Sequence, residues 1–400
     1  MRDLTASQRK IIGSERHIWP NELAFAEAIY ADRLELIQQD ILVRGLSVVI
    51  LFDPENMYWL TGYQTIGYFT FQAMCIPASG KPVIVTRVVN RDMALALPTI
   101  GDAISVFDTQ DHVDVLEAYL KDTVPTGQIG IDTTSRYLNI CDYTRLVDRL
   151  GGRFKPFINV IEAHRMVKTL CELDRMRAAA SAVKAGIDAA LKMIVVGKTD
   201  NDLAAALYQG SIAAGSEYIG HPPMVVTGPR SELCFALWKR NTIEKGDVVL
   251  LEGAGCVDRY HAMMSRSAVV GKATDEHKAT ADALVEILET AIDTIKPGVT
   301  AGEVDFACRQ KVEKRGLGQY FKSRTAYGIG IGFPPNWAEG HIYSLRPNDP
   351  MVLQPNMTFH VIPTMFRTGF GMAISDSVRV TEDGCEVLTN YPRDLMEIDA

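Results

Sequence analysis

The pattern of apolar residues changes near the middle of the chain, and this change limits the folds that the chain can adopt. Before residue 150, short apolar runs bounded by turn-forming residues alternate with segments of helical periodicity. The runs that we interpret as strands are LSVVILF (46–52), MYWLTGY (57–63), AMCIPAS (73–79), PVIVTRVV (82–89) and residues 128–131. The helices that we expect around them cover residues 22–45, 112–122 and 138–150. Strands alternating with helices predict an α/β domain with a mainly buried sheet.

A different pattern follows a connecting segment at residues 151–169. A long amphipathic helix is predicted from Cys171 to Val196, and a shorter helix follows at residues 201–214. The later elements comprise strands at 223–227, 247–255, 264–271, 357–363, 375–381 and 385–389, and helices at 275–294 and 301–315. We therefore expect an α/β domain over residues 1–165 and an α+β domain over residues 166–400.

Composition narrows the class of protein. The formal net charge of −8 argues against a general affinity for nucleic acid or for an anionic membrane. The seven cysteines are scattered without a CxxC pair, which favours reduced thiols over disulfides or a zinc cluster. The first twenty residues contain no apolar core of a secretory signal, and no window is long and apolar enough for a membrane helix. We expect a soluble, cytoplasmic protein.

The second half contains a series of segments that resembles one known superfamily. The segments are, in order, IEKGDVVLLEGAG, RYHAMMSRS, YGIGIGFPPNW, LQPNMTFHVIP and SDSVRVTEDGCEVLT, and they span residues 243–389. Their order is similar to that in the creatinase, aminopeptidase P and methionine aminopeptidase superfamily. The resemblance implies an N-terminal creatinase-like α/β domain followed by a C-terminal pita-bread α+β domain.

Metal-dependent members of that superfamily hold two divalent ions with carboxylates and one histidine, and this chain departs from their pattern. The five ligand positions carry Glu252, Met263, Tyr327, Ile362 and Ser375. Among these, Glu252 alone keeps a carboxylate of the kind that a hard divalent ion prefers. We therefore expect no metal and no other cofactor. The two histidines associated with peptidase activity are also replaced, by Phe235 and Pro334, so the resemblance does not imply a peptidase.

Within the superfamily, one branch is the most similar. The segments EYIGHPPMVVTG, CFALW, LLEGAGCVDRYHAM and GFPPNWAEGH resemble those of the ectoine hydrolases. That resemblance implies hydrolytic opening of the cyclic amidine of ectoine to N-acetyl-diaminobutyrate, with hydroxyectoine as a second candidate substrate. It also implies a homodimer and makes the deacetylase that acts next a candidate partner. In creatinase-like dimers the N-terminal domain of one subunit covers the site of the other, and the candidates for that role are Tyr58, Trp59, Tyr68 and Phe69.

The residue types around the altered ligand positions suit an organic cation. An amidinium that carries a carboxylate is bound by aromatic faces, by an anion at its N–H groups and by a donor at its carboxylate. The candidates for substrate binding are Phe235, Trp238, Tyr327, Trp337 and Glu339, and the candidates for the carboxylate donor are Arg230, Arg266 and Arg324. Three of them also have a structural alternative, since Trp238 and Trp337 can simply pack in the core and Glu339 can be a solvated loop charge.

Glu252 is the candidate for the central catalytic group. It can attack the amidinium carbon as a nucleophile, or it can activate water as a general base. We favour the nucleophile because no metal is expected to supply hydroxide. His261 and His360 are candidates to pass a proton to the departing ring nitrogen, because histidine titrates near neutrality.

Two other functions compete with amidine hydrolysis. The first is a different hydrolase or lyase on this fold, such as a dimethylsulfoniopropionate lyase. Those relatives resemble the metal-keeping pattern, so Met263 and Ile362 argue against it. The second is a catalytically inactive pita-bread module that binds proteins or nucleic acid. The acidic balance of the chain and the ordered aromatic and acidic replacements argue against that reading.

Overall fold

A computed structural model describes residues 22–399 of the chain. The N-terminal segment in which the sequence shows no signal-type apolar core lies outside the described residues. The chain divides into two compact units, one that ends at His164 and one that begins at Arg165. Helix α7 (Val160–Met166) spans the boundary between the units. No helix within the described residues is long and apolar enough to cross a membrane.

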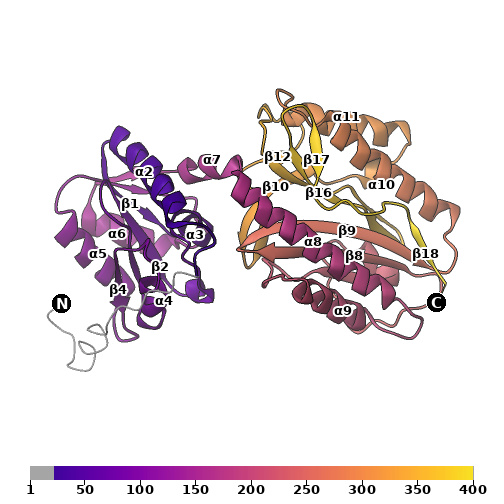
Figure 1. Cartoon of the computed structure of the whole chain (residues 1–400), viewed down its shortest axis with the longest axis horizontal. Coiled ribbons are helices and arrows are strands. Elements are labelled where there is room, and N and C mark those ends of the chain that lie inside the picture. The colour runs from indigo at the N-terminus through magenta and orange to yellow at the C-terminus, as the bar shows by residue number, and fades with distance from the viewer. Residues whose placement is uncertain (1–21, 400) are drawn as a thin grey trace. The chain divides into compact units, whose positions relative to one another are not determined.

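The first unit is a six-stranded mixed sheet with helices on its faces (Figure 1). The strand order is β4-β3-β2-β1-β5-β6, in which β1 pairs with β2 antiparallel and with β5 parallel. The strands are β1 (Leu46–Leu51), β2 (Gln72–Pro77), β3 (Val83–Arg87), β4 (Asp102–Val106), β5 (Gln128–Ile131) and β6 (Phe154–Pro156). The helices are α2 (Glu27–Val43), α3 (Pro54–Thr61), α4 (Arg91–Leu95), α5 (His112–Thr123) and α6 (Ile140–Leu150). This is the α/β architecture that the alternating pattern predicts.

One predicted strand of this unit is wrong. The run MYWLTGY at residues 57–63 lies largely in helix α3, which begins at Pro54 and ends before Gly62. Proline fits the first turn of a helix because its missing N–H is not needed there, and Gly62 adopts the left-handed conformation that ends a helix (φ 74°). A short apolar run does not distinguish a buried helix from a buried strand, so the flanking proline and glycine were the better signal.

The helices of the second unit form two pairs. The first pair is α8 (Leu170–Lys192) and α9 (Asp200–Ala213), and the second is α10 (Asp275–Thr294) and α11 (Ala301–Lys314). Each helix begins after a threonine, and a side chain three residues later accepts a hydrogen bond from the backbone N–H of that threonine. These reciprocal caps satisfy backbone groups that a helix start leaves free. The four helices match the sequence prediction to within a few residues.

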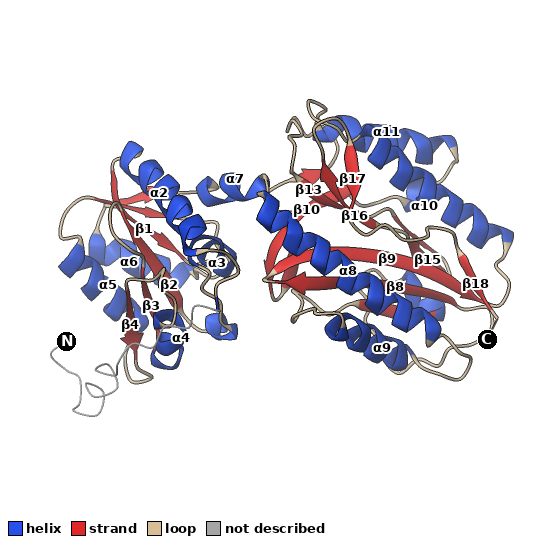
Figure 2. Ribbon diagram, viewed as in Figure 1, coloured by secondary structure: helices blue, strands red, loops and turns tan. Residues whose placement is uncertain are grey.

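A long, mostly antiparallel sheet lies between these helix pairs (Figure 2). Its order is β17-β16-β13-β10-β9-β8-β7, and β11 and β12 pair with β10. The strands are β7 (Met224–Thr227), β8 (Val248–Val257), β9 (Tyr260–Val270), β10 (Ala326–Phe333), β11 (Asn336–Ala338), β12 (Ser344–Leu345), β13 (Thr358–Val361), β16 (Asp376–Val380), β17 (Cys385–Val387) and β18 (Met396–Ile398). A separate hairpin joins β14 (Thr364–Arg367) to β15 (Phe370–Ala373). Helices α8 and α9 pack on β7–β9, while α10 and α11 enclose a second apolar cluster with β10, β13, β15 and β16.

Candidate active site

A cavity of about 250 Å³ lies within the second unit. Its walls come from strands β7, β8, β10, β11 and β14 and from the segment between β7 and β8. Six of the residues that the sequence singled out line it, namely Phe235, Glu252, Arg324, Tyr327, Trp337 and Ile362. The cavity therefore brings together the expected acid and three of the expected aromatic side chains, at a volume that suits a small organic molecule.

Glu252 lies in β8, between Met224 of β7 and Ser265 of β9. Its side chain is buried, with 3% of the residue exposed, and it lines the cavity. No hydrogen bond or ion pair to this carboxyl group occurs within residues 22–399. Burial alone raises the pKa of Glu252 to about 8. The site thus holds an acid that is mostly protonated at neutral pH and that a bound cation would ionise.

Tyr327 and Trp337 form the aromatic wall and contact each other. The indole Nε1–H of Trp337 donates a hydrogen bond to the Tyr327 hydroxyl at 3.2 Å. The imidazole of His221 lies against the Trp337 ring, with 3.4 Å between the ring centroids. Phe235 adopts a left-handed backbone conformation (φ 62°) and keeps its ring exposed at the cavity. An exposed aromatic ring beside a cavity is typical of a ligand contact.

The residues at the five altered ligand positions do not all line the cavity. Glu252, Tyr327 and Ile362 line the cavity, whereas Met263 is fully buried and Ser375 bonds to the ring of His360. No group of three or more His, Cys, Asp or Glu side chains in the described part of the chain is arranged to hold a metal ion. One carboxyl, a phenol and a hydroxyl among apolar side chains do not form the donor set that two hard divalent ions require.

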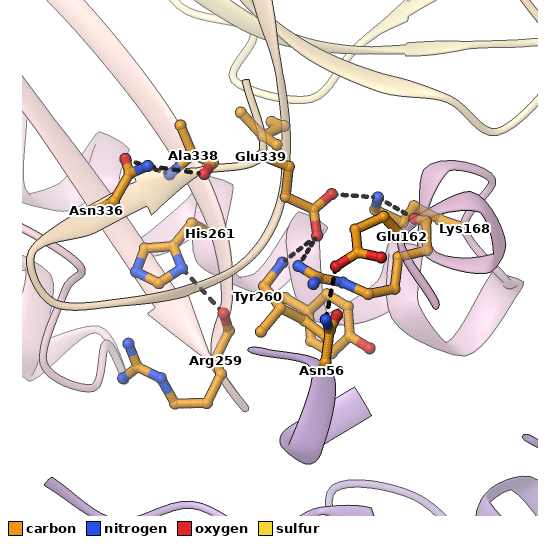
Figure 3. A network of polar contacts seen from close by, with 12 residues as sticks. Asn56, Glu162, Lys168, Arg259, Tyr260, His261, Asn336, Ala338 and Glu339 are labelled. Carbon is orange, nitrogen blue, oxygen red and sulfur yellow. Dashed lines mark hydrogen bonds and ion pairs between the residues drawn. The ribbon is translucent and has the colours of Figure 1, made fainter. Parts of the chain in front are cut away.

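Glu339 does not line the cavity, in contrast to the role that the sequence suggested. It is buried, and its carboxylate binds Arg165 at 2.6 Å and Lys168 at 2.7 Å (Figure 3). It also accepts a hydrogen bond from the backbone N–H of Ile331 at 3.2 Å. Coulombic attraction to Lys168 and Arg165 outweighs burial and lowers the pKa of Glu339. This carboxylate is a structural ion-pair partner, so we do not assign it to the substrate.

His261 and Trp238 also lie away from the cavity lining. The His261 ring is fully buried, and its Nδ1 lies 2.9 Å from the Arg259 carbonyl (Figure 3). Its Nε2 accepts a hydrogen bond from the Gly220 N–H at 3.0 Å. Both ring nitrogens are engaged by the backbone, which leaves neither to move a proton to a substrate. Trp238 packs edge-on against Tyr208 beside the core of α8, α9 and β7–β9. These placements favour structural roles for both residues.

His360 is one step removed from the cavity. It lies in β13, fully buried, and does not line the cavity itself. Its Nδ1 is 2.7 Å from the hydroxyl of Tyr327, which does line the cavity. Burial, with smaller contributions from Arg266 and His221, lowers the pKa of His360 to about 3. The ring is therefore neutral and acts on the cavity only through Tyr327.

The structure distinguishes among the three candidate arginines. Arg266 is fully buried and paired with Asp376 at 3.0 Å, and Arg230 donates to the carbonyl of Leu237 outside the cavity lining. Arg324 lines the cavity, with its guanidinium 5.3 Å from the centre of the Tyr327 ring. Arg324 is thus the arginine that is placed to meet a substrate carboxylate.

Several lining residues did not stand out in the sequence as binding candidates. They include Cys234, Ser323, Asn336, Thr364 and Phe366. Asn336 and Thr364 each lie within two residues of a motif position, Trp337 and Ile362, and that proximity was the available signal. Phe366 reaches the cavity through the β14–β15 hairpin, whose return the sequence pattern did not predict.

The two tryptophans provide a matched pair for mutation. We expect Trp337→Phe to raise the KM for a cationic substrate roughly 10-fold, because the variant loses both the larger ring face and the bond to Tyr327. Trp238→Phe should leave the KM unchanged and lower only the melting temperature, since Trp238 packs on the core. Steady-state kinetics and thermal unfolding of both variants check this. An equal rise in KM for the two variants would contradict the placement of Trp238.

Comparison with known proteins identifies the family. Residues 174–382 match the model of metallopeptidase family M24, and residues 33–167 match the creatinase/prolidase N-terminal domain. The chain belongs to metallopeptidase family M24. The two matches confirm the fold class that the ordered segments predicted, with a creatinase-like N-terminal domain before a pita-bread domain.

The relatives of this M24 chain are named for different activities. It is 29% identical over 393 residues to the ectoine hydrolase of Halomonas elongata, across 93% of this chain and 98% of that protein. It is 27% identical over 377 residues to the probable dipeptidase PepE of Mycobacterium tuberculosis, across 94% and 98%. The prolidase of Thermococcus sibiricus superposes with a TM-score of 0.83 over 92% of this chain and 99% of that chain, at 23% identity. That last likeness shows the fold, and the first confirms the resemblance to ectoine hydrolases.

Proposed function

We propose that this chain is a metal-independent hydrolase that opens the cyclic amidine ring of ectoine to N-acetyl-diaminobutyrate. The observation that carries the proposal is the Glu252 carboxyl, buried in the wall of an aromatic cavity with no polar partner among residues 22–399. The similarity to the ectoine hydrolase of Halomonas elongata supports the choice of substrate.

A buried carboxyl without a partner disfavours its own ionisation and attracts a cation. A cyclic amidinium supplies that positive charge together with N–H donors, and its planar N–C–N unit is of the kind that aromatic faces such as those of Phe235 and Trp337 attract. Arg324 offers a counter-charge for a carboxylate on the same ligand. The cavity therefore suits a small molecule that carries both charges.

Two routes for Glu252 satisfy the chemistry. As a nucleophile, its carboxylate bonds to the amidinium carbon, and one ring C–N bond breaks as the departing nitrogen takes a proton from solvent. Water then bonds to the same carbon, which releases the N-acetyl product, the free carboxylate and one proton to solvent. As a general base, it takes a proton from water while the water oxygen bonds to that carbon, and the proton goes to the departing nitrogen. We favour the nucleophile because the altered ligand set is not suited to a metal that would generate hydroxide. Both routes require the ionised carboxylate.

The pH dependence follows from that requirement. Because burial raises the pKa of Glu252 to about 8, the free enzyme holds mostly the protonated acid at pH 7. We expect kcat/KM for ectoine to rise about 10-fold per pH unit below pH 8 and to level off above it. A pH profile between pH 6 and pH 10 checks this. A flat profile across that range would show that the free carboxyl is already ionised.

The experiment that tests the function compares substrates. The purified protein is incubated separately with ectoine, a proline-containing dipeptide and dimethylsulfoniopropionate, and products are followed by mass spectrometry. We expect N-acetyl-diaminobutyrate from ectoine and no turnover of the other two. Cleavage of the dipeptide or the sulfonium compound would overturn the substrate assignment. Failure to convert any of the three would favour a binding module.

The assembly is proposed on the family resemblance. We propose a homodimer, and we propose the deacetylase that consumes N-acetyl-diaminobutyrate as a partner. Sedimentation of the protein alone and with that deacetylase tests both, since a single monomeric species in each case would contradict them.

A further inference from the structure

A chain of hydrogen bonds runs from the sheet to the cavity. Ser265 of β9 contacts Ser375, Ser375 Oγ lies 2.7 Å from His360 Nε2, and His360 Nδ1 lies 2.7 Å from the Tyr327 hydroxyl. The hydroxyl also accepts the bond from Trp337. Ser265 and Ser375 are buried, and so is His360. Each of these contacts has the length of a hydrogen bond. Counting the donors and acceptors that each group offers assigns which atom carries each hydrogen.

The direction is set at Ser375. The backbone N–H and the side-chain O–H of Ser265 both donate to Ser375 Oγ, each at 2.7 Å. A hydroxyl oxygen has two lone pairs and one hydrogen, so these two bonds fill its acceptor positions. The remaining contact of Ser375 Oγ, with His360 Nε2, is therefore made by the hydrogen of Ser375 itself. Nε2 is the acceptor in this contact and carries no proton.

The same count of donors and acceptors assigns the hydrogens of His360 and Tyr327. A neutral imidazole whose Nε2 is bare carries its hydrogen on Nδ1, and that N–H donates to the Tyr327 oxygen. Trp337 Nε1–H is a donor only, so the Tyr327 oxygen accepts from both neighbours. Its own O–H has no acceptor among these neighbours and is left for a group in the cavity that Tyr327 lines.

We infer that Tyr327 presents its hydroxyl hydrogen to the cavity and, together with Arg324, forms a subsite for the anionic group of the substrate, with His360 as the residue that positions this hydrogen. The inference rests on the proposed function and extends it, because it defines the substrate class as small cyclic amidines that carry a carboxylate. A hydroxyl that can only donate repels amidinium N–H groups and donates a hydrogen bond to a carboxylate oxygen. Glu252 provides the opposite preference within the same cavity.

The backbone leaves room for Arg324 in this subsite. A Cβ on Gly340 would lie 2.7 Å from Arg324 Nη2 and 2.9 Å from the Cβ of Tyr327. The glycine thus allows the guanidinium to lie over the Tyr327 ring, where Nη1 also donates to the Gly340 carbonyl at 3.3 Å. The two donors of the subsite are held beside each other by this contact.

The first test is spectroscopic and does not depend on activity. The nitrogen chemical shifts of His360, assigned in the full-length protein with His360→Gln as the blank, report which ring nitrogen carries the hydrogen. We expect the Nδ1–H form in the wild type and a shift toward the other form in Ser375→Ala, which removes the donor to Nε2. A wild-type ring protonated on Nε2, with or without a proton on Nδ1, would overturn the inference.

The second test separates the subsite from the proposed function. Binding of ectoine and of the same cyclic amidine without its carboxylate is measured by calorimetry. For Tyr327→Phe and His360→Leu we expect affinity for ectoine to fall about 10- to 100-fold and affinity for the second ligand to change less than about 3-fold. His360→Asn, which keeps an N–H donor, should lie nearer the wild type. Equal losses for both ligands would overturn the subsite, whereas a wild type that binds ectoine but does not convert it would overturn the proposed function alone.

Discussion

Replacing Glu252 with glutamine should reduce kcat for ectoine roughly 10³-fold or more, because the amide is neither a nucleophile nor a base. The variant should still fold, since glutamine has nearly the same size and Glu252 makes no polar contact in the described structure that the change would break. Single-turnover assays with the purified variant measure the loss. Near-wild-type turnover would contradict both routes proposed for this carboxyl.

The same substitution should stabilise the protein at high pH. The folded-state pKa of Glu252, about 8, lies above its ordinary value of 4.5, so the folded state holds a proton that the unfolded chain releases. The free energy of unfolding of the wild type therefore falls as the pH rises from about 4.5 to 8. The glutamine variant lacks this loss and should be more stable above pH 8, on the order of a few kcal/mol. Equal pH dependence of unfolding in the two proteins would show that Glu252 is not desolvated.

Removing the carboxylate of Glu339 should destabilise the second unit by about 3–5 kcal/mol, because two buried cations, Arg165 and Lys168, lose their shared partner. Glu339→Gln is the conservative form of this change. It should lower the denaturation midpoint strongly, and the folded fraction should keep its KM for ectoine. Denaturant unfolding and kinetics below the midpoint measure the two effects. A raised KM with unchanged stability would show that Glu339 binds the substrate and is not a structural ion-pair partner.

The pH dependence of this ion pair has the opposite sign to that of Glu252. The folded-state pKa of Glu339 is lowered by Lys168 and Arg165, so its contribution is complete above the ordinary carboxyl value and is lost as the pH falls through the lowered value. Wild type and Glu339→Gln should therefore converge in stability in acid. A difference that persists undiminished at low pH would point to packing and not to charge.

The sequence predicted the fold and part of the site. The order of the segments between residues 243 and 389 predicted the pita-bread domain, and reading the ligand positions one by one led to Glu252 and Tyr327. Both lie on long strands, β8 and β10, whose alternation fixes which side chains share a face. Local pattern was sufficient there because β8 and β10 lie on either side of β9 in one sheet, where Glu252 and Tyr327 both line the cavity.

Other assignments depended on contacts that no local pattern contains. From the sequence, Glu339 is indistinguishable from a solvated loop charge. In the structure it binds Arg165 and Lys168, which lie 174 and 171 residues away in the chain. Arg324 could not be chosen over Arg266, because only the structure shows that Arg266 is paired with Asp376. The indirect place of His360 was also beyond the sequence, since it follows from the bonds of its ring to the Tyr327 hydroxyl and to Ser375.

The central claim is that this member of a metallopeptidase family hydrolyses a cyclic amidine without a metal ion. The most direct measurement is kcat for ectoine as a function of metal content, with the protein stripped by chelator and its residual metal measured by mass spectrometry. Undiminished kcat at far less than one ion per chain, with no gain on adding manganese, cobalt or zinc, is the predicted result. Loss of activity on stripping that is restored by a divalent ion would contradict the claim.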